Sequence, residues 1–242
     1  MTTHASSDAK GFAATHWTVV MTAARGSDSS RAEAALTELC QTYWYPLYAF
    51  LRRRGHESHA AEDLTQAFFA SLLARDFLAK IDRQKGRFRS FLLASLKNFL
   101  ADEHDRAAAQ KRGGGQPVIS LDGLNAESRY RLEPAHDLSP EKLYEKQWAL
   151  SVLERVLSRL QAEAAAGGRL PLFDHLQATL IDSQSTRYAA IASKLGMTEG
   201  AIKSAAHRFR QRYRELLIDE ISQTVADPVE VDGEIRYLMS CL

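Results

Sequence analysis

Apolar residues recur along most of the chain at steps of three and four positions. This spacing places them on one face of an α-helix. The first strongly periodic stretch begins after Arg31 and contains Ala35, Leu36, Leu39, Tyr43, Leu47, Phe50 and Leu51, with Pro46 as an expected kink or break. The sequence has no run that alternates apolar and polar residues as a β-strand would. We therefore expect an all-α fold.

Local signals mark where the later helices begin and end. Ser58 follows the turn at Gly55 and is placed to cap a helix, and Ser139 followed by Pro140 is typical of another helix start. Phe88 to Arg106 reads as one long helix. Further helices are expected at residues 171–180, at 188–195, and from Thr198 to about residue 221.

Glycines and prolines divide the chain into parts. Three consecutive glycines at residues 113–115, followed by Pro117 and Pro134 in a stretch without periodicity, predict a flexible linker. We expect two helical domains joined by this linker. The predicted boundaries are an N-terminal extension at 1–30, a first domain at 31–112, the linker at 113–140, a second domain at 141–218 and an acidic extension at 219–242.

The segment from Tyr188 to Lys203 has the features of a helix-turn-helix motif. Small Ala192 would let two helices cross closely, Gly196 would supply the left-handed turn residue, and Thr198 would cap the second helix. The expected shared core of the motif consists of Ile191, Leu195, Met197 and Ile202.

Charge is distributed unevenly although the net charge is only +1. Residues 83–112 carry eight basic side chains against three acidic ones, and residues 194–214 carry six against one. From Glu215 onward there are seven acidic residues and one basic residue. Basic patches on helices are typical of nucleic-acid binding. We expect the helix after Thr198 to fit a major groove, with base-edge donors at one end and phosphate partners along the remainder. Its expected exposed positions are Lys203, Ser204, His207, Arg208, Arg210, Gln211 and Arg214.

Several classes of function are not indicated. Cys40 and Cys241 are isolated and have no metal-ligand or C-x-x-C spacing, and the glycines at 113–115 are not part of a phosphate-binding P-loop. His56 and His59 lie in a loop without a metal-binding pattern. No apolar run reaches the roughly 20 residues of a membrane span, and the first residues lack a secretion signal. We expect a cytoplasmic protein that is not an enzyme, needs no cofactor or metal and does not bind membranes.

Three segments together resemble the extracytoplasmic-function (ECF) class of bacterial RNA polymerase sigma factors. The segment AEDLTQAF at residues 61–68 is similar to the family signature A-E-D-L-x-Q-E-x-F. The segment GRFRSFL at residues 86–92, followed by Asn98 and Asp102, and the helix-turn-helix region at 188–217 occur in the same order as in the family. The resemblance covers roughly residues 31–112 and 141–218.

The resemblance implies roles for particular residues. The first domain would dock on the clamp helices of the polymerase core through Glu62, Asp63 and Gln66, and the flap of the core would be a further contact. The −10 promoter element would be melted and bound by Arg87, Phe88, Lys97, Asn98, Arg106, Lys111 and Arg112. The −35 element would be read by Thr198, Lys203, Ser204, His207, Arg208 and Arg210.

The chain departs from the family pattern at the docking helix and at the C-terminus. Ala67 stands where the family usually has Glu, and Thr65 lies two residues earlier. Phosphorylation of Thr65 by a Ser/Thr kinase would restore negative charge and switch on docking; the alternative is a partly buried Thr without a regulatory role. The acidic extension either masks DNA contacts or packs as a helix of the second domain. The alternative function is a two-domain regulator that binds duplex DNA without polymerase.

Overall fold

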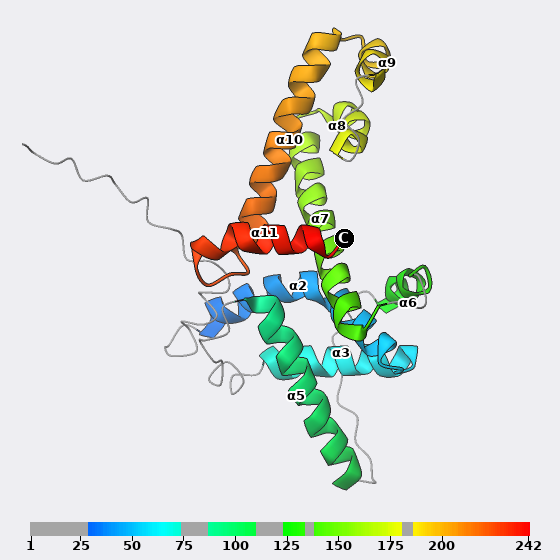
Figure 1. The fold of residues 1–242 in the computed structure, drawn as a ribbon, viewed down its shortest axis with the longest axis vertical. Coiled ribbons are helices and arrows are strands. Elements are labelled where there is room, and N and C mark those ends of the chain that lie inside the picture. Colours follow the sequence, from blue (N-terminus) through cyan, green and yellow to red (C-terminus); the bar gives the residue numbers. More distant parts are fainter. Residues whose placement is uncertain (1–28, 74–86, 110–122, 134–137, 181–185) are drawn as a thin grey trace, which may run out of the picture.

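The computed structural model describes residues 29–73, 87–109, 123–133, 138–180 and 186–242 (Figure 1). Within these ranges the regular elements are helices, and the one extended pairing is an isolated antiparallel bridge between Arg87 and Val225. The predicted all-α class is confirmed. Predictions for the N-terminal residues up to 28, for the basic loop before Arg87, and for Lys111 and Arg112 lie outside the described residues.

The helices follow the chain in an order that agrees broadly with the periodicity. They are α2 (Ser29–Arg53), α3 (Ser58–Leu73), α5 (Phe88–Ala109), α6 (Gly123–Arg131), α7 (Pro140–Ala166), α8 (Leu170–Leu176), the 3₁₀ turn η1 (Gln177–Leu180), α9 (Thr186–Leu195), α10 (Glu199–Ser222), the 3₁₀ turn η2 (Pro228–Glu230) and α11 (Val231–Ser240). Helix α2 continues through Pro46 without a break. Ser139 caps α7 as predicted, since its side chain accepts a hydrogen bond from the Lys142 N–H at 3.3 Å.

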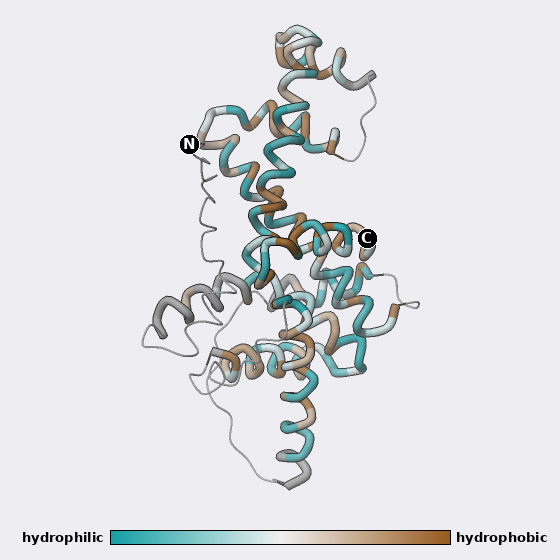
Figure 2. Tube along the Cα trace, turned by 60° about the vertical axis from the view of Figure 1, so that its left-hand side comes forward, coloured by the Kyte–Doolittle hydropathy of each residue, from teal (hydrophilic) through white to brown (hydrophobic). Residues whose placement is uncertain are grey.

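One large hydrophobic core joins helices from both ends of the chain. Helix α2 lies at its centre, packed against α3 and α7. Tyr43, Phe50 and Trp148 are buried in this core, and Leu217 and Leu238 close it from α10 and α11. Figure 2 shows apolar residues gathered where α10 and α11 cross the middle of the molecule. The boundary predicted at residue 141 therefore separates helices that share a core.

A second, smaller core lies at the other end of α10. It contains buried side chains of α8, of α9 and of the first half of α10, including Leu176, Ile191 and Ile202. The 24-residue helix α10 thus belongs to both cores, because Ile202 and Leu217 lie in different clusters. Helix α10, with α7 beside it, leads from the main body of the molecule to the helix-turn-helix end (Figure 1).

The predicted linker contains a helix that the sequence patterns did not indicate. Helix α6 packs on α2, where Glu127 accepts hydrogen bonds from Tyr48 at 2.6 Å and from Arg52 at 3.0 Å. The Arg129 guanidinium also lies 4.1 Å from the centre of the Tyr45 ring. A fully flexible linker is therefore wrong for residues 123–131, which these contacts fix to the core. Across the described ranges, no helix combines the length and the apolarity that crossing a membrane requires.

Candidate nucleic-acid interface

Helices α9 and α10 form a helix-turn-helix whose turn follows from two residues. Gly196 has a φ of +64°, the left-handed conformation that glycine adopts without strain. Thr198 then caps α10, because its side-chain oxygen accepts the N–H of Ala201 at 3.2 Å. Ala192 is buried in the contact between the helices, together with Ile191 and Ile202. These features agree with the predictions. Met197, which was predicted to lie in the shared core, is instead 39% exposed.

The first half of α10 presents an exposed basic and polar face. Lys203, Ser204, His207 and Arg208 are all exposed and lie at helical spacing on the part of α10 that follows the turn. Lys203 makes one i,i+4 ion pair with Glu199 at 2.7 Å, in which both side chains remain about half exposed. Pairs of this kind contribute little and exchange readily for other partners. The face is therefore open to an external ligand.

Farther along α10, Arg210 and Arg212 are engaged within the protein. Arg210 donates to the Tyr188 hydroxyl at 3.0 Å and so helps to fix α9 on α10. Arg212 forms a two-bond pair with Glu163 of α7, at 2.7 and 2.9 Å, and also reaches Glu215 at 3.0 Å. Arg210 is therefore partly structural, whereas Arg208 nearer the turn stays exposed.

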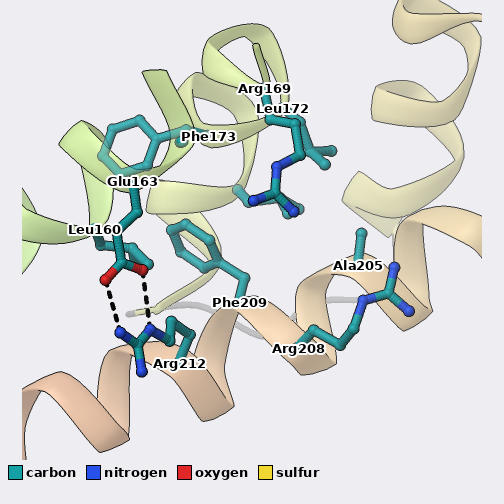
Figure 3. Close-up of a pocket in the computed structure, with 11 residues that line it drawn as sticks. Leu160, Glu163, Arg169, Leu172, Phe173, Ala205, Arg208, Phe209 and Arg212 are labelled. Carbon is teal, nitrogen blue, oxygen red and sulfur yellow. Dashed lines mark hydrogen bonds and ion pairs between the residues drawn. The ribbon is translucent and has the colours of Figure 1, made fainter. Parts of the chain in front are cut away.

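A hollow of about 370 Å³ lies between α7, α8 and α10 at the base of the helix-turn-helix. Figure 3 shows the Phe173 and Phe209 rings facing one another beside it, with Arg169 and Arg208 along its rim and the Glu163–Arg212 pair at one end. The two rings are 5.8 Å apart in an edge-to-face arrangement. This hollow is mainly apolar with a basic rim.

The residues predicted for the −10 element do not form one open surface. Lys97 and Asn98 are exposed on α5, although Lys97 contacts Glu141 of α7 at 2.8 Å. Phe88 is fully buried and packs edge-to-face on Tyr43 at 5.0 Å, so in this structure its ring cannot stack on a base. Arg87 is paired with Glu234 at 3.2 Å. Arg106 lies in α5, but its side chain is outside the described residues.

The residues predicted for docking lie together on α3. Asp63 is exposed, and Glu62 and Gln66 are half-buried one helical turn apart, with the Gln66 amide donating to Glu62 at 3.4 Å. Ala67, where the resemblance expects Glu, is also exposed. Helix α3 therefore has an exposed acidic face, and position 67 on it is free to carry one more charge.

Thr65 lies on the opposite side of α3 from Asp63 and Ala67. It is fully buried, and its hydroxyl donates to the Ala61 carbonyl oxygen at 2.7 Å within the helix. The hydroxyl is thus satisfied inside the protein, and a phosphate would not fit at Thr65 without a movement of α3. The alternative prediction, that this Thr is a packing residue, agrees with its position.

The sequence did not predict the roles of Arg89, at the start of α5, and Glu234, in α11. Arg89 and Glu234 are both buried, and the Arg89 Nε lies 2.5 Å from a carboxylate oxygen of Glu234. The two residues are far apart in the chain, and neither belongs to a local motif. The charge inversion after Glu215 was the one signal in the sequence that pointed to such a contact.

Comparison with known proteins gives an informative similarity. The chain is 28% identical over 200 residues to the ECF RNA polymerase sigma factor SigE of Mycolicibacterium smegmatis, which covers 81% of this chain and 68% of the relative. No protein-family profile matches the chain. No solved structure matches it. The similarity to SigE supports the resemblance of this chain to ECF sigma factors.

Proposed function

We propose that this protein is an RNA polymerase sigma factor that directs promoter-specific initiation of transcription. The observation that carries the proposal is the exposed basic face after the turn of the helix-turn-helix, at the tip of α10, in a chain similar to an ECF sigma factor over most of its length. The function is one of binding, in the cytoplasm, and requires no catalytic group or cofactor.

The exposed residues divide into three surfaces with different partners. Lys203, Ser204, His207 and Arg208 would read the −35 element in the major groove, since side-chain donors on a helix reach base edges there. The α3 face around Asp63 would dock on the clamp helices of the polymerase. Lys97 and Asn98 on α5 would contact the −10 element. Phe88 supports that surface by fixing α5 to the core.

Run-off transcription with purified core polymerase tests the proposal. We expect the full-length chain to direct specific transcripts from its own promoter and Asp63→Arg to abolish them, because a positive charge reverses the docking face while leaving an exposed site folded. Duplex binding by Asp63→Arg should stay unchanged and serves as the control. Absence of any transcript with the wild-type chain, across promoters that it binds, would contradict the proposal.

We propose in addition that phosphorylation of Thr65 regulates docking. A Ser/Thr kinase would transfer the terminal phosphoryl group of a nucleotide to the Thr65 hydroxyl and add about −1.5 to −2 charges to α3. Because Thr65 is buried, the kinase must act on a conformation in which α3 has left the core. Equal affinity for the clamp helices before and after kinase treatment, with modification of Thr65 verified by mass spectrometry, would reject this switch.

A regulator that binds duplex DNA without polymerase is the second candidate. The open face of α10 supports it equally well, because duplex recognition needs the helix-turn-helix alone. The two candidates differ in their need for core enzyme. A regulator would shift the transcription of a polymerase that already carries another sigma factor and would give no transcript with core enzyme alone.

A further inference from the structure

The start of α5 is joined to the segment that follows α10. Arg87 and Val225 form an antiparallel bridge, and the Phe88 N–H donates to the Thr224 carbonyl oxygen at 2.9 Å. Thr224 and Val225 are themselves buried. Two backbone segments from opposite halves of the chain are thereby held side by side at the N-terminal end of α5.

Helix α11 adds a buried carboxylate to this contact. Glu234 is 1% exposed, and its two oxygens lie 2.5 Å from Arg89 Nε and 3.2 Å from Arg87 Nε. A buried carboxylate is costly unless opposite charges and hydrogen bonds offset its loss of water. Glu234 therefore depends on both arginines, and the arginines in turn hold α11 in place.

Aromatic rings complete the enclosure of Arg89. Its guanidinium lies 3.9 Å from the centre of the Tyr237 ring in α11 and 5.2 Å from the centre of the Trp148 ring in α7. Glu145 of α7 lies 3.6 Å away, and the Tyr144 hydroxyl donates to the Arg89 carbonyl oxygen at 2.9 Å. A guanidinium between two carboxylates and two rings is not available to a phosphate group.

The two candidate DNA-binding surfaces are thus in different states. The basic face of α10 is open, whereas at the start of α5 Arg89 is buried beneath α11, and Arg87 is paired with Glu234 while about 35% of its side chain stays exposed. In Figure 1, α11 crosses the molecule beside α2, far from the helix-turn-helix tip. The acidic extension does not mask the basic face of α10. It reaches the first predicted domain instead.

We propose that residues 223–242 form an intramolecular lid that buries Arg89 and engages Arg87 in an ion pair, and that its release frees both arginines for the phosphates of single-stranded nucleic acid. The proposal rests on the function proposed above, in which α5 contacts a melted promoter strand. Closed, the chain binds duplex through α10 alone. When the lid is open, the chain also offers the two guanidinium groups at the start of α5, the helix that carries Lys97 and Asn98.

Two substitutions loosen the lid in different ways. Glu234→Gln removes the buried charge that holds both arginines, and Tyr237→Leu removes the ring on Arg89 without changing charge. Asp232→Asn is the matched control, because Asp232 lies in the same helix, is exposed, and loses the same charge as Glu234→Gln. The Glu234→Gln and Asp232→Asn substitutions preserve side-chain size, whereas Tyr237→Leu removes an aromatic ring.

Binding of a fluorescently labelled oligo(dT) strand to the full chain, followed by anisotropy, measures the open fraction. The apparent affinity of a site that is mostly closed rises in proportion to its open population. We expect Glu234→Gln and Tyr237→Leu to tighten oligo(dT) binding by about tenfold. Asp232→Asn should bind as the wild type does, and duplex binding should be the same in all four proteins.

Hydrogen exchange of the Phe88 amide gives a readout that needs no ligand, since this N–H is bonded to Thr224 across the lid. It should exchange faster in both lid variants while the amides of α2 remain protected. Unchanged exchange and unchanged oligo(dT) affinity in both variants would overturn the lid. Equal tightening by Asp232→Asn would also overturn it, because charge alone would then explain the gain. If run-off transcription fails while the lid variants still respond as expected, the sigma function is rejected and the lid proposal stands.

Discussion

The Arg52 guanidinium donates to both carboxylate oxygens of Glu127, from Nε and from Nη2, each at 3.0 Å. Tyr48 adds a third hydrogen bond, 2.6 Å long, to the same carboxylate. Two residues of α2 thus fix α6, the one described helix of the predicted linker. Burial alone would raise the pKa of Glu127, but the bonds from Tyr48 and Arg52 outweigh it and lower the pKa to about 2, from an ordinary 4.5.

This arrangement predicts a defined acid sensitivity. A carboxylate whose folded pKa is depressed contributes stability above its unfolded pKa and loses that contribution as the pH falls through the folded value. We expect Glu127→Gln to lower the free energy of unfolding by about 1–2 kcal/mol at neutral pH. The difference between wild type and variant should shrink between about pH 5 and pH 2, as measured by urea unfolding at each pH.

The control is Glu154→Gln. Glu154 pairs with Arg129 of the same helix α6 at 3.2 Å, but its side chain is 60% exposed. Exposed pairs contribute little, so this variant should change the free energy of unfolding by less than about 0.5 kcal/mol. A loss equal to that of Glu127→Gln would show that burial and the Tyr48 bond do not matter.

A pair of glycines in the helix-turn-helix predicts opposite effects of the same substitution. Gly196 has a φ of +64°, so Gly196→Ala should lower the free energy of unfolding by about 1 kcal/mol through backbone strain. Gly200 lies in the first turn of α10 with open space around its Cα, so Gly200→Ala should raise it by about 0.5 kcal/mol. Thermal unfolding followed by circular dichroism separates the two, and a stabilised Gly196→Ala would refute the turn conformation.

Parts of the structure that depend on local chemistry followed from the sequence. Gly196, Thr198 and Ser139 each act on residues within four positions, and the structure has all three in their predicted roles. Helix α6 did not follow, because its sequence is charged and short and it is stabilised by Arg52, which lies more than 70 residues away. A helix of this length forms when tertiary contacts support it.

The side chains that share an exposed face could be predicted from the sequence for α10 but not for α5. The α10 face lies within one helix, where spacing alone decides which side chains share a side. On α5 the state of Arg87 and Phe88 depends on Glu234 and Tyr43, which no local pattern links to them. In the structure Phe88 is buried together with Phe91 and Leu96 of the same helix.

Two arginines of α10 provide a test of the duplex-binding face. Arg208 is exposed near the turn, whereas Arg212 is held by Glu163 and Glu215. Arg208→Ala should weaken binding to a target duplex by about 1–3 kcal/mol if it reaches a base, or lower the salt dependence by about one unit if it reaches a phosphate. Arg212→Ala should leave both the affinity and the salt slope near the wild-type values, as measured by fluorescence anisotropy over a salt series.

Thr65 and Ala67 separate the two roles that α3 combines. Thr65→Glu places a carboxylate in a fully buried site, so we expect a loss of more than about 2 kcal/mol in the free energy of unfolding. Ala67→Glu adds the same charge at an exposed position of the same helix and should leave stability within about 0.5 kcal/mol. Urea unfolding of both variants measures this contrast.

Ala67→Glu and Thr65→Glu, together with Thr65→Val, also test whether negative charge on α3 strengthens docking. If docking responds to charge on the exposed face of α3, Ala67→Glu should tighten binding to isolated clamp helices, because it adds charge beside Asp63 without disturbing the core. Thr65→Val, which removes the hydroxyl but keeps the shape, should bind as the wild type does. Tightening by Thr65→Glu together with a preserved free energy of unfolding would show that α3 readily turns Thr65 outward. Burial would then be no obstacle to a kinase.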